Sequence, residues 1–223
     1  MLHGFNSFFV SVLVGGVLQA AINYCVKSQV LRQAVYVTEM PEGDTKKERW
    51  LTRNEAARLL RQSRREHMGV ADFVMVGLYT GWRKQAILGL QWQANTAMCW
   101  IDLENERMHR PAAKGRKTET IPIPARLISH LKRIRKRTRQ YVIEWEGKPL
   151  ANMRRSWATA AKRAGLGKDV TPHTMRHTAV TWRLQRGIST WDVAGFVGMS
   201  ERMVKDRYGH HCPDFMTKAK EAY

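Results

Sequence analysis

The chain has 223 residues, of which 43% are hydrophobic, enough for one sizeable core or for one core with a short appendage. Lys and Arg number 38 against 19 Asp and Glu, so the formal net charge is +19 at pH 7. This balance indicates a polyanionic partner, with nucleic acid as the leading candidate and an anionic membrane surface as its rival. Cys25, Cys99 and Cys212 are too few and too widely spaced for a disulfide framework, so we expect reduced thiols and a cytoplasmic protein.

The first apolar stretch, residues 5–24, predicts an amphipathic helix that packs on another element. It lacks the Lys or Arg that opens a secretory signal, and polar residues such as Asn6 and Gln19 interrupt it as a membrane span. Leu13 and Val17 follow helical spacing instead. A membrane anchor remains the alternative for this stretch.

A linker and a helical region follow. Residues 35–48 mix charges with Pro and Gly, as linkers do. Leu51, Thr52 and Glu55 form a hydrophobic staple and a capping box, which predict a helix ending near Gln62. Further helices are expected at about residues 71–79, 82–92, 125–139, 152–164, 172–186, 190–197 and 200–208.

Three β-like runs lie among these helices, separated by the turn-like stretches ENE and KGRK. They cover about residues 97–103, 106–113 and 118–123. The sequence therefore predicts an α+β fold, mainly helical with a small three-stranded antiparallel sheet, and not a parallel α/β fold.

Two basic residues occupy positions where a charge needs a partner. In the predicted helix 82–92, Arg83 shares a stripe with Ala86 and Ile87 and has no acidic residue one turn further on. Its guanidinium would then meet a distant carboxylate or a bound anion, unless it simply reaches water. Lys114 lies at the predicted tip of a hairpin, from which it can reach into a groove, although exposed hairpin lysines are commonplace.

The stretch TPHTMRHTAV predicts an anion site at a helix start. Thr171 is a candidate N-cap and Pro172 fits the first helical position, which places His173 in the first turn. Arg176 and His177 follow at spacings that bring them near His173 on one face. Imidazole and guanidinium groups beside free helix N–H groups suit an anion.

Close to the C-terminus, Tyr208 ends a short predicted helix, with Gly209 expected to terminate it. Alone, such a tyrosine is usually a half-buried packing residue. The run His210, His211 and Cys212 lacks a second pair of metal ligands, so no metal site is expected.

The order of the blocks TGWR, KGRKTETIPI, HTMRHT and RYGH resembles the catalytic domain of the tyrosine recombinase, or phage integrase, family. The resemblance covers roughly Leu51 to His211, so residues 49–223 are expected to form that domain. Residues 1–34 look like the last helix of the family's N-terminal core-binding domain, the rest of which this sequence lacks.

The resemblance implies a reaction and the residues that carry it. Arg83 and Arg176 would clamp the scissile DNA phosphate, Lys114 would protonate the leaving 5′ oxygen, His173 would handle a proton, and Tyr208 would be the nucleophile. A phenol that attacks phosphorus keeps the phosphodiester energy in a 3′-phosphotyrosyl bond, so strands rejoin without ATP or metal. No cofactor is therefore expected.

Three positions qualify this assignment. His177 is expected to support packing, as the residue after the second arginine more often does in the family. Met199 stands where the family usually has His or Trp, and it cannot donate a hydrogen bond to phosphate, although Trp at that position also indicates packing. Ala86 replaces a usual acidic residue, which would leave Arg83 less well oriented without DNA.

The expected partner is duplex DNA. The helix 125–139 carries many Lys and Arg over a buried stripe, which indicates phosphate contacts or else a merely solvated face. The candidate DNA-contact residues are Arg116, Lys117, Lys132, Arg135 and Arg139. The resemblance also implies self-association on DNA as a tetrameric synapse, in which the C-terminal tail would dock on a neighbouring protomer.

We therefore expect a site-specific recombinase or integrase of phage or mobile-element DNA. One alternative is a truncated DNA-binding remnant without full recombination activity, which Met199 and the short N-terminal part favour. A basic membrane-surface protein is the other alternative, and it rests on residues 5–24 alone.

Overall fold

A computed structural model describes residues 7–33, 49–111, 118–150 and 152–213, with residues 7–16 described by their backbone. The chain divides into two compact units, residues 1–48 and 49–223. The first contains helix α1 (Ser7–Lys27), which extends the helix predicted at residues 5–24. Val17 and Tyr24 on α1 are 66% and 71% exposed, so the expected packing partner is not among the described residues of this unit. None of the described helices combines the length and the apolarity that crossing a bilayer requires.

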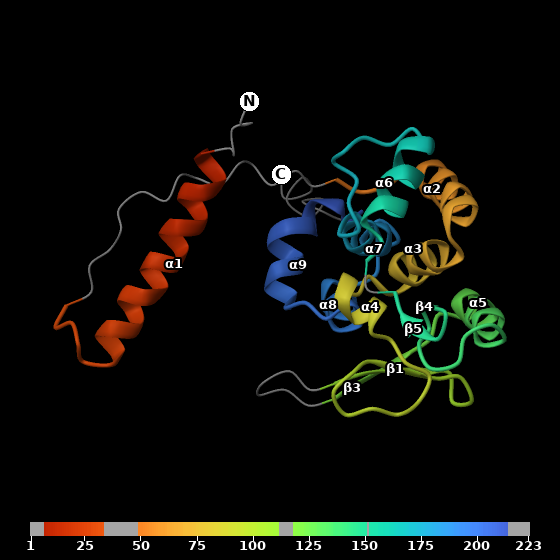
Figure 1. Cartoon of the computed structure of the whole chain (residues 1–223), viewed down its shortest axis with the longest axis horizontal. Coiled ribbons are helices and arrows are strands. Elements are labelled where there is room, and N and C mark those ends of the chain that lie inside the picture. Colours follow the sequence, from red (N-terminus) through yellow and green to blue (C-terminus); the bar gives the residue numbers. More distant parts are fainter. Residues whose placement is uncertain (1–6, 34–48, 112–117, 151, 214–223) are drawn as a thin grey trace, which may run out of the picture. The chain divides into compact units, whose positions relative to one another are not determined.

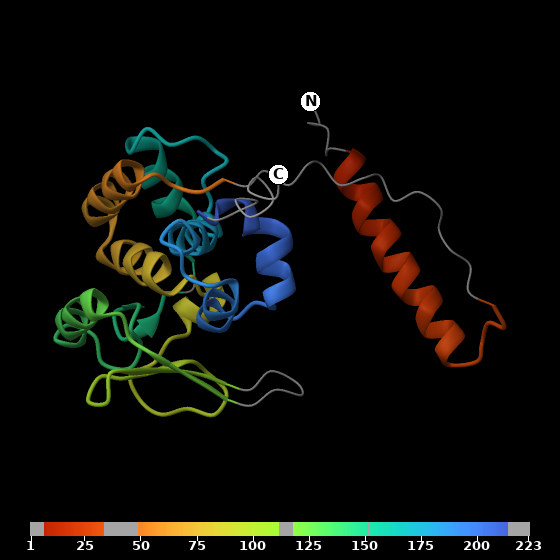
Figure 2. The ribbon, with the colours of Figure 1, turned by 180° about the vertical axis from the view of Figure 1, so that it is seen from behind.

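The second unit has the predicted α+β architecture, mainly helical with a small antiparallel sheet (Figure 1). Helices α2 (Arg53–Glu66) and α6 (Arg154–Arg163) pack on each other, α2 packs on α3 (Met68–Thr80), and α3 packs on α7 (Thr174–Leu184). Viewed from behind, α7 lies in the middle of these helices (Figure 2). The remaining helices are α4 (Lys84–Leu88), α5 (Ala125–Arg135), α8 (Thr190–Val197), α9 (Glu201–Tyr208) and the 3₁₀ turn η1 (Gly209–His211).

The sheet has the order β1 (Trp100–Asp102), β2 (Arg107–Arg110), β3 (Glu119–Pro122), with antiparallel pairs throughout. Ile101 pairs with Met108 and Met108 with Ile121, and all three side chains are buried. One apolar row therefore fixes the register, because a slip by one residue would turn this row to solvent.

A second, two-stranded hairpin, β4 (Glu144–Trp145) and β5 (Lys148–Pro149), was not predicted. Its strands are too short for alternation to show in the sequence. Only the Glu146–Gly147 turn between them, with positive φ at both residues, is a recognisable signal.

The first helix of this unit begins as predicted. The Glu55 amide donates to Thr52 Oγ1 (3.2 Å) and the Thr52 amide donates to Glu55 Oε2 (2.8 Å), which completes the capping box. The helix continues to Glu66, beyond the predicted end near Gln62, and α3 starts at Met68, before the predicted residue 71. Both differences arise at His67, which ends α2 and caps α3 by accepting from the Gly69 amide at 3.0 Å.

Helix α4 is shorter than the predicted helix 82–92. It covers Lys84–Leu88 only, because the chain turns at Gly89 and Gln91 then pairs with Trp100. Arg83 consequently lies at the N-cap of α4 and is exposed, and it does not sit on an apolar stripe inside a helix.

Two further helix boundaries differ from the prediction. Thr171 makes no side-chain cap; its amide donates to the Thr174 hydroxyl (3.0 Å), and a turn through Pro172 and His173 precedes the helix, so His173 lies at the N-cap position. Gly209 has φ −55° and continues the chain into η1, so it does not terminate α9 as a left-handed residue.

Gly81 closes α3 and brings the chain onto α4. It has φ +66°, and a Cβ there would lie 2.9 Å from Val197 Cγ1 and 3.0 Å from the Ala179 Cβ. The left-handed conformation and the lack of space both require glycine at this position. The turn thereby holds the loop before Arg83 against α7 and α8.

We predict that Gly81→Ala destabilises the unit by more than Gly187→Ala does. Gly187 has a similar φ of +76°, and nothing lies within 4 Å of a Cβ built there. Gly187→Ala should therefore cost only the strain of a left-handed backbone, roughly 1–2 kcal/mol. Gly81→Ala adds an overpacking cost of about 1–3 kcal/mol. Urea unfolding of the two variants measures the difference, and equal losses of stability would contradict the packing argument.

Candidate active site

The guanidinium of Arg176 is fixed by three backbone carbonyls from two helix ends. Nη1 donates to the carbonyl oxygens of Gly81 (2.8 Å) and Val197 (2.7 Å), and Nη2 donates to that of Gly198 (2.9 Å). Gly81 and Gly198 are the left-handed C-cap residues of α3 and α8. A helix C-terminus presents unpaired carbonyls and partial negative charge, so a buried arginine is stabilised between two such ends.

These bonds use three of the five N–H groups of the guanidinium. Arg176 is 4% exposed, so the position of its side chain is set by the fold. A rigidly held guanidinium with donors to spare is a preorganised anion binder, because little conformational entropy is lost when the anion arrives.

Positive charges gather around Arg176. Its pKa is lowered to about 10, first by burial and next by repulsion from Arg83, with a smaller repulsion from Arg110, while Tyr208 acts in the opposite direction. Arg83 itself is exposed at the N-cap of α4, so it can reach a ligand from the surface. An anion bound between these guanidinium groups would relieve their repulsion.

His173 faces the same cluster from the turn before α7. Although it is exposed, the protein packed beneath its ring lowers its pKa, and the charges of Arg176, Arg207 and Arg83 lower it further. The ring meets that of His177 edge-on, with centroids 4.7 Å apart. The structure thus brings together Arg83, His173 and Arg176, as the sequence motifs predicted.

Tyr208 joins the cluster from α9. Its ring packs in a second apolar cluster with residues such as Val180 and Val204, and the residue is 2% exposed. Its hydroxyl oxygen lies 2.6 Å from Nδ1 of His177, within hydrogen-bond distance. Tyr208 is therefore buried and hydrogen-bonded, and not the half-buried residue expected from its position alone.

His177, which the sequence placed near His173 but assigned to packing, is a further functional candidate. Burial lowers its pKa to about 4, and the positive charges of His173, Arg207 and Arg176 add to the effect, so its imidazole is neutral at pH 7. We had expected it to support packing, but its nitrogen contacts the hydroxyl of the candidate nucleophile. Local sequence gives no signal for this contact, because 31 residues separate the two partners.

The two departures from the family pattern both lie in packed positions. Met199 is partly buried against the apolar cluster that contains Tyr208, which fits a packing role at that position. Ala86 packs against the main core from within α4, the helix at whose N-cap position Arg83 lies.

Several predicted site residues lie apart from this cluster or cannot be placed. Lys114, Arg116 and Lys117 fall outside the described residues. Helix α5, whose last turn carries Lys132 and Arg135, lies on the side of the unit opposite α9 (Figures 1 and 2). Arg135 donates to the Thr138 carbonyl at 3.0 Å. Contact of Lys132, Arg135 and Arg139 with DNA stays a prediction.

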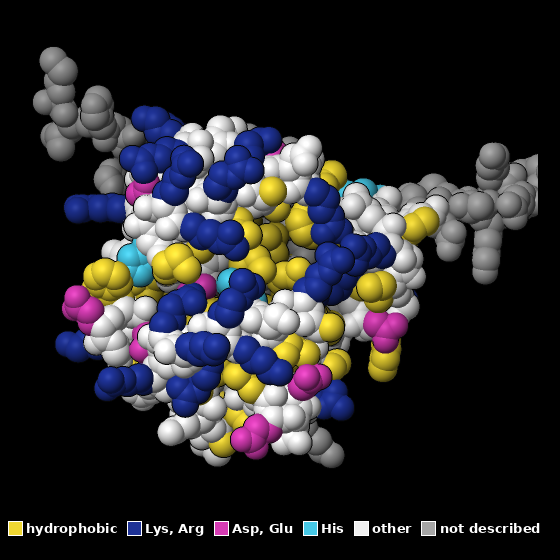
Figure 3. Space-filling view, turned by 90° about the vertical axis from the view of Figure 1, so that its right-hand side faces the viewer, with side chains coloured by type: hydrophobic (Ala, Val, Ile, Leu, Met, Phe, Trp, Pro, Cys, Tyr) yellow, Lys and Arg dark blue, Asp and Glu magenta, His cyan; other side chains and the backbone are white. Residues whose placement is uncertain are grey.

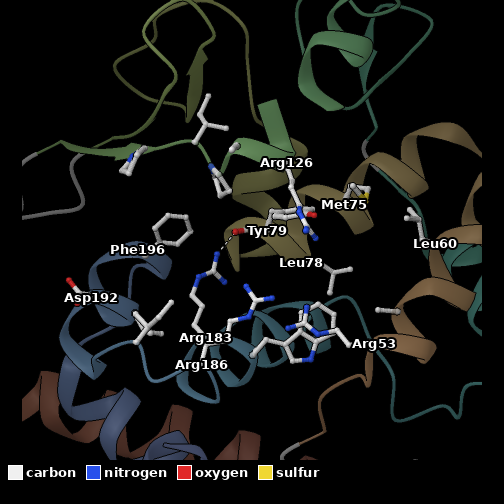
Figure 4. A pocket seen from close by; sticks show the side chains of 18 of the residues that line it. Arg53, Leu60, Met75, Leu78, Tyr79, Arg126, Arg183, Arg186, Asp192 and Phe196 are labelled. Carbon is white, nitrogen blue, oxygen red and sulfur yellow. Dashed lines mark hydrogen bonds between the residues drawn. The ribbon is translucent and has the colours of Figure 1, made fainter. Parts of the chain in front are cut away.

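A groove of about 680 Å³ lies away from the catalytic candidates (Figure 4). Apolar residues such as Leu60, Met75 and Phe196 line it together with several arginines, and Arg183 is fixed there by the Tyr79 and Ala179 carbonyls. Its lining includes none of the residues that converge around Arg176. The position of this groove therefore does not identify the candidate active site.

Within the described part of the chain, no group of three or more His, Cys, Asp or Glu side chains is arranged to hold a metal ion. What the fold does assemble is a cationic cluster with a buried phenol beside it. A rigid guanidinium, a second arginine, an imidazole and a tyrosine are the chemical groups that a phosphate-binding site with its own nucleophile would need.

Comparison with known proteins agrees with this class of site. The model of the phage integrase family matches residues 49–213. The chain is 24% identical over 192 residues to the integrase of Salmonella phage P22, covering 82% of this chain and 49% of that protein. It is 24% identical over 177 residues to the shufflon-specific DNA recombinase of Escherichia coli, covering 79% and 44% respectively. The chain thus spans about half the length of these curated relatives.

Solved structures share the fold. The catalytic domain of the bacteriophage HP1 integrase aligns with a TM-score of 0.55 at 21% identity, over 78% of this chain and 94% of that one. The integrase of the Tn1549 transposon, solved in complex with transposon right end DNA, aligns with a TM-score of 0.72 at 18% identity, over 93% and 77%. The chain belongs to the phage integrase family, as its motifs predicted.

We predict that Arg176→Lys destabilises the unit by about 2–4 kcal/mol, because the donors of an ammonium lie on one nitrogen and cannot replace both Nη1 and Nη2, which leaves buried acceptors unpaired. The matched control is Arg83→Lys, which changes the same residue type at an exposed position and should shift stability by less than about 0.5 kcal/mol. Urea unfolding of both variants measures this contrast. An Arg176→Lys protein as stable as Arg83→Lys would contradict the anchoring role.

Proposed function

We propose that this chain is a tyrosine-type site-specific DNA recombinase that breaks and rejoins duplex DNA through a 3′-phosphotyrosyl bond formed by Tyr208. The observation that carries the proposal is the convergence of Arg83, His173 and Arg176 on one face, with the phenol of Tyr208 next to it. Family membership supports the general class of reaction.

The roles proposed for Arg176, Arg83 and His173 follow from the positions of their side chains, whereas that of Lys114, which lies outside the described residues, rests on family resemblance. Arg176, held by the backbone, and Arg83, free at the surface, would bind the non-bridging oxygens of the scissile phosphate and stabilise the charge that grows there. His173 would donate a hydrogen bond to the same phosphate. Lys114 would give a proton to the leaving 5′ oxygen.

The charge of the protein supports DNA as the substrate. Lys and Arg side chains are spread over the face shown in Figure 3, around an apolar hollow, with few acidic side chains among them. A protein of net charge +19 gains affinity for DNA by releasing counterions from the backbone, largely independently of sequence. Lys132, Arg135 and Arg139 stay candidates for contacts to the DNA backbone, on the side of the unit opposite α9 (Figure 1).

A DNA-binding protein that does not complete strand transfer is the second candidate. Two observations favour it: Tyr208 is only 2% exposed, and Met199 offers no hydrogen bond to phosphate. For the recombinase, DNA binding must therefore bring the phenol and the phosphate within bonding distance. A protein that only binds DNA does not need to bring these two groups together.

We predict a covalent protein–DNA adduct that depends on Tyr208. Because the target sequence is unknown, the protein is incubated with a pool of nicked duplexes of random sequence. Cleavage close to the nick frees a short fragment that carries the 5′ hydroxyl. Once this fragment diffuses away, rejoining is impossible and the phosphotyrosyl bond is trapped. Adducts are isolated on a denaturing gel and their DNA is sequenced. The selected site is then used in all later assays.

The control is Tyr208→Phe, which removes one oxygen and leaves the packing of the ring in place. The wild-type protein should form the adduct and the variant should not, while both retain salt-sensitive binding to the duplex. Binding by the wild-type protein without any adduct would favour the second candidate, and an adduct formed equally by Tyr208→Phe would contradict Tyr208 as the nucleophile.

A further inference from the structure

The hydroxyl of the proposed nucleophile already has an imidazole in place to take its proton. Tyr208 Oη and His177 Nδ1 are 2.6 Å apart, at the short end of hydrogen-bond distances, and the two rings are tilted with centroids 5.6 Å apart. Tyr208 is almost fully buried and His177 partly so, which limits the competition of water for this contact.

We propose that His177 is the general base of strand cleavage and accepts the phenol proton of Tyr208 at Nδ1. The inference rests on the proposed function, because it assigns a base to the attack by Tyr208. It also separates two roles within the motif HTMRHT: His173, exposed at the surface, serves the phosphate, and His177, one turn further into α7, serves the nucleophile.

The proton and the electrons can be followed through the step. A lone pair on Tyr208 Oη forms the O–P bond as the P–O5′ bond breaks, and the phenol proton passes to His177 Nδ1. The leaving 5′ oxygen takes a proton from a general acid, for which Lys114 is the candidate. In rejoining, the 5′ hydroxyl attacks phosphorus and its proton returns to the base form of the same general acid, while the imidazolium of His177 returns its proton to the departing phenolate.

The charges around His177 make its basicity depend on the substrate. In the DNA-free protein burial holds the pKa of His177 near 4, and the charges of His173 at the N-cap of α7, Arg207 on α9 and Arg176 on α7 add to this effect. A phosphodiester bound at Arg83 and Arg176 would bring a negative charge into the same cluster. This charge offsets the repulsion and raises the pKa of His177, so the base becomes effective only when DNA is present.

The test uses His177→Asn in the full chain. The Asn side chain places a hydrogen-bonding group close to the position of Nδ1 but cannot accept the proton, so it separates orientation of the phenol from base catalysis. His211→Asn is the matched control, since His211 lies on η1 and its ring packs edge-on against that of Trp50. Circular dichroism and DNA binding establish that both variants are folded.

At neutral pH we expect His177→Asn to form the adduct about 10²- to 10⁴-fold more slowly than wild type, the contribution typical of a general base, with DNA affinity within about twofold. The pH dependence should differ as well. The wild-type rate rises with pH as His177 loses its proton and then levels off, whereas the variant rate continues to rise toward the pKa of the phenol. His211→Asn should follow the wild-type curve.

A second measurement needs no DNA, and its decisive observation is made on the wild-type protein. In wild-type protein, ¹⁵N NMR of the histidine side chains should show His177 as the neutral tautomer with the proton on Nε2 and an unprotonated Nδ1, whose shift changes in Tyr208→Phe. A proton on Nδ1 would overturn the inference, because that nitrogen would then donate to the phenol.

The outcomes are distinguishable. A His177→Asn protein with the wild-type rate and pH profile would overturn the base assignment and leave the proposed function intact. Absence of any Tyr208-dependent adduct with wild-type protein would overturn the proposed function, and the base assignment with it.

Discussion

The structure of the site depends on one buried cation between two helix ends. The guanidinium of Arg176 joins the C-terminus of α3, through Gly81, to the C-terminus of α8, through Val197 and Gly198. Each helix end would otherwise leave buried carbonyls without donors, which is costly for the folded state. The same side chain that satisfies the backbone therefore becomes the fixed element around which the other charges are arranged.

This arrangement lowers the stability of the folded protein but prepares the cluster to bind an anion. A buried arginine with further cations nearby is electrostatically unfavourable, as its lowered pKa shows, and the helix ends offset only part of that cost. The uncompensated positive charge is what makes the cluster selective for an anion. In the proposed reaction a phosphodiester would supply the negative charge that the protein leaves out, and its binding energy would be directed to the atoms that react.

Much of the fold could be predicted from local sequence, because the signals were local. The capping box of Thr52 and Glu55, the alternation through Met108 and the buried stripe of α5 each depend on neighbours in the chain. Helix boundaries were less accurate where a non-standard cap decided them, as His67 does, or where a strand bridge ended a helix early, as at Gln91.

The family resemblance proposes the residue types of the candidate site, but the sequence does not give their contacts. The motifs identified Arg83, His173, Arg176 and Tyr208 through family resemblance, and the fold brings them close. The anchoring of Arg176 by the carbonyls of Gly81 and Gly198, and the contact of His177 with Tyr208, join segments far apart in the chain. Such pairings follow from helix packing and leave no trace in local periodicity.

The most direct measurement is a crystal structure of the protein with cleaved site DNA and orthovanadate, which mimics a five-coordinate phosphorus. The account predicts vanadium bonded to Tyr208 Oη, with the guanidinium groups of Arg176 and Arg83 on its equatorial oxygens and the Gly81 and Gly198 carbonyls still bound to Arg176. Vanadate bound elsewhere, or bound in the cluster with Tyr208 Oη out of bonding reach, would contradict the claim that these residues form one active site.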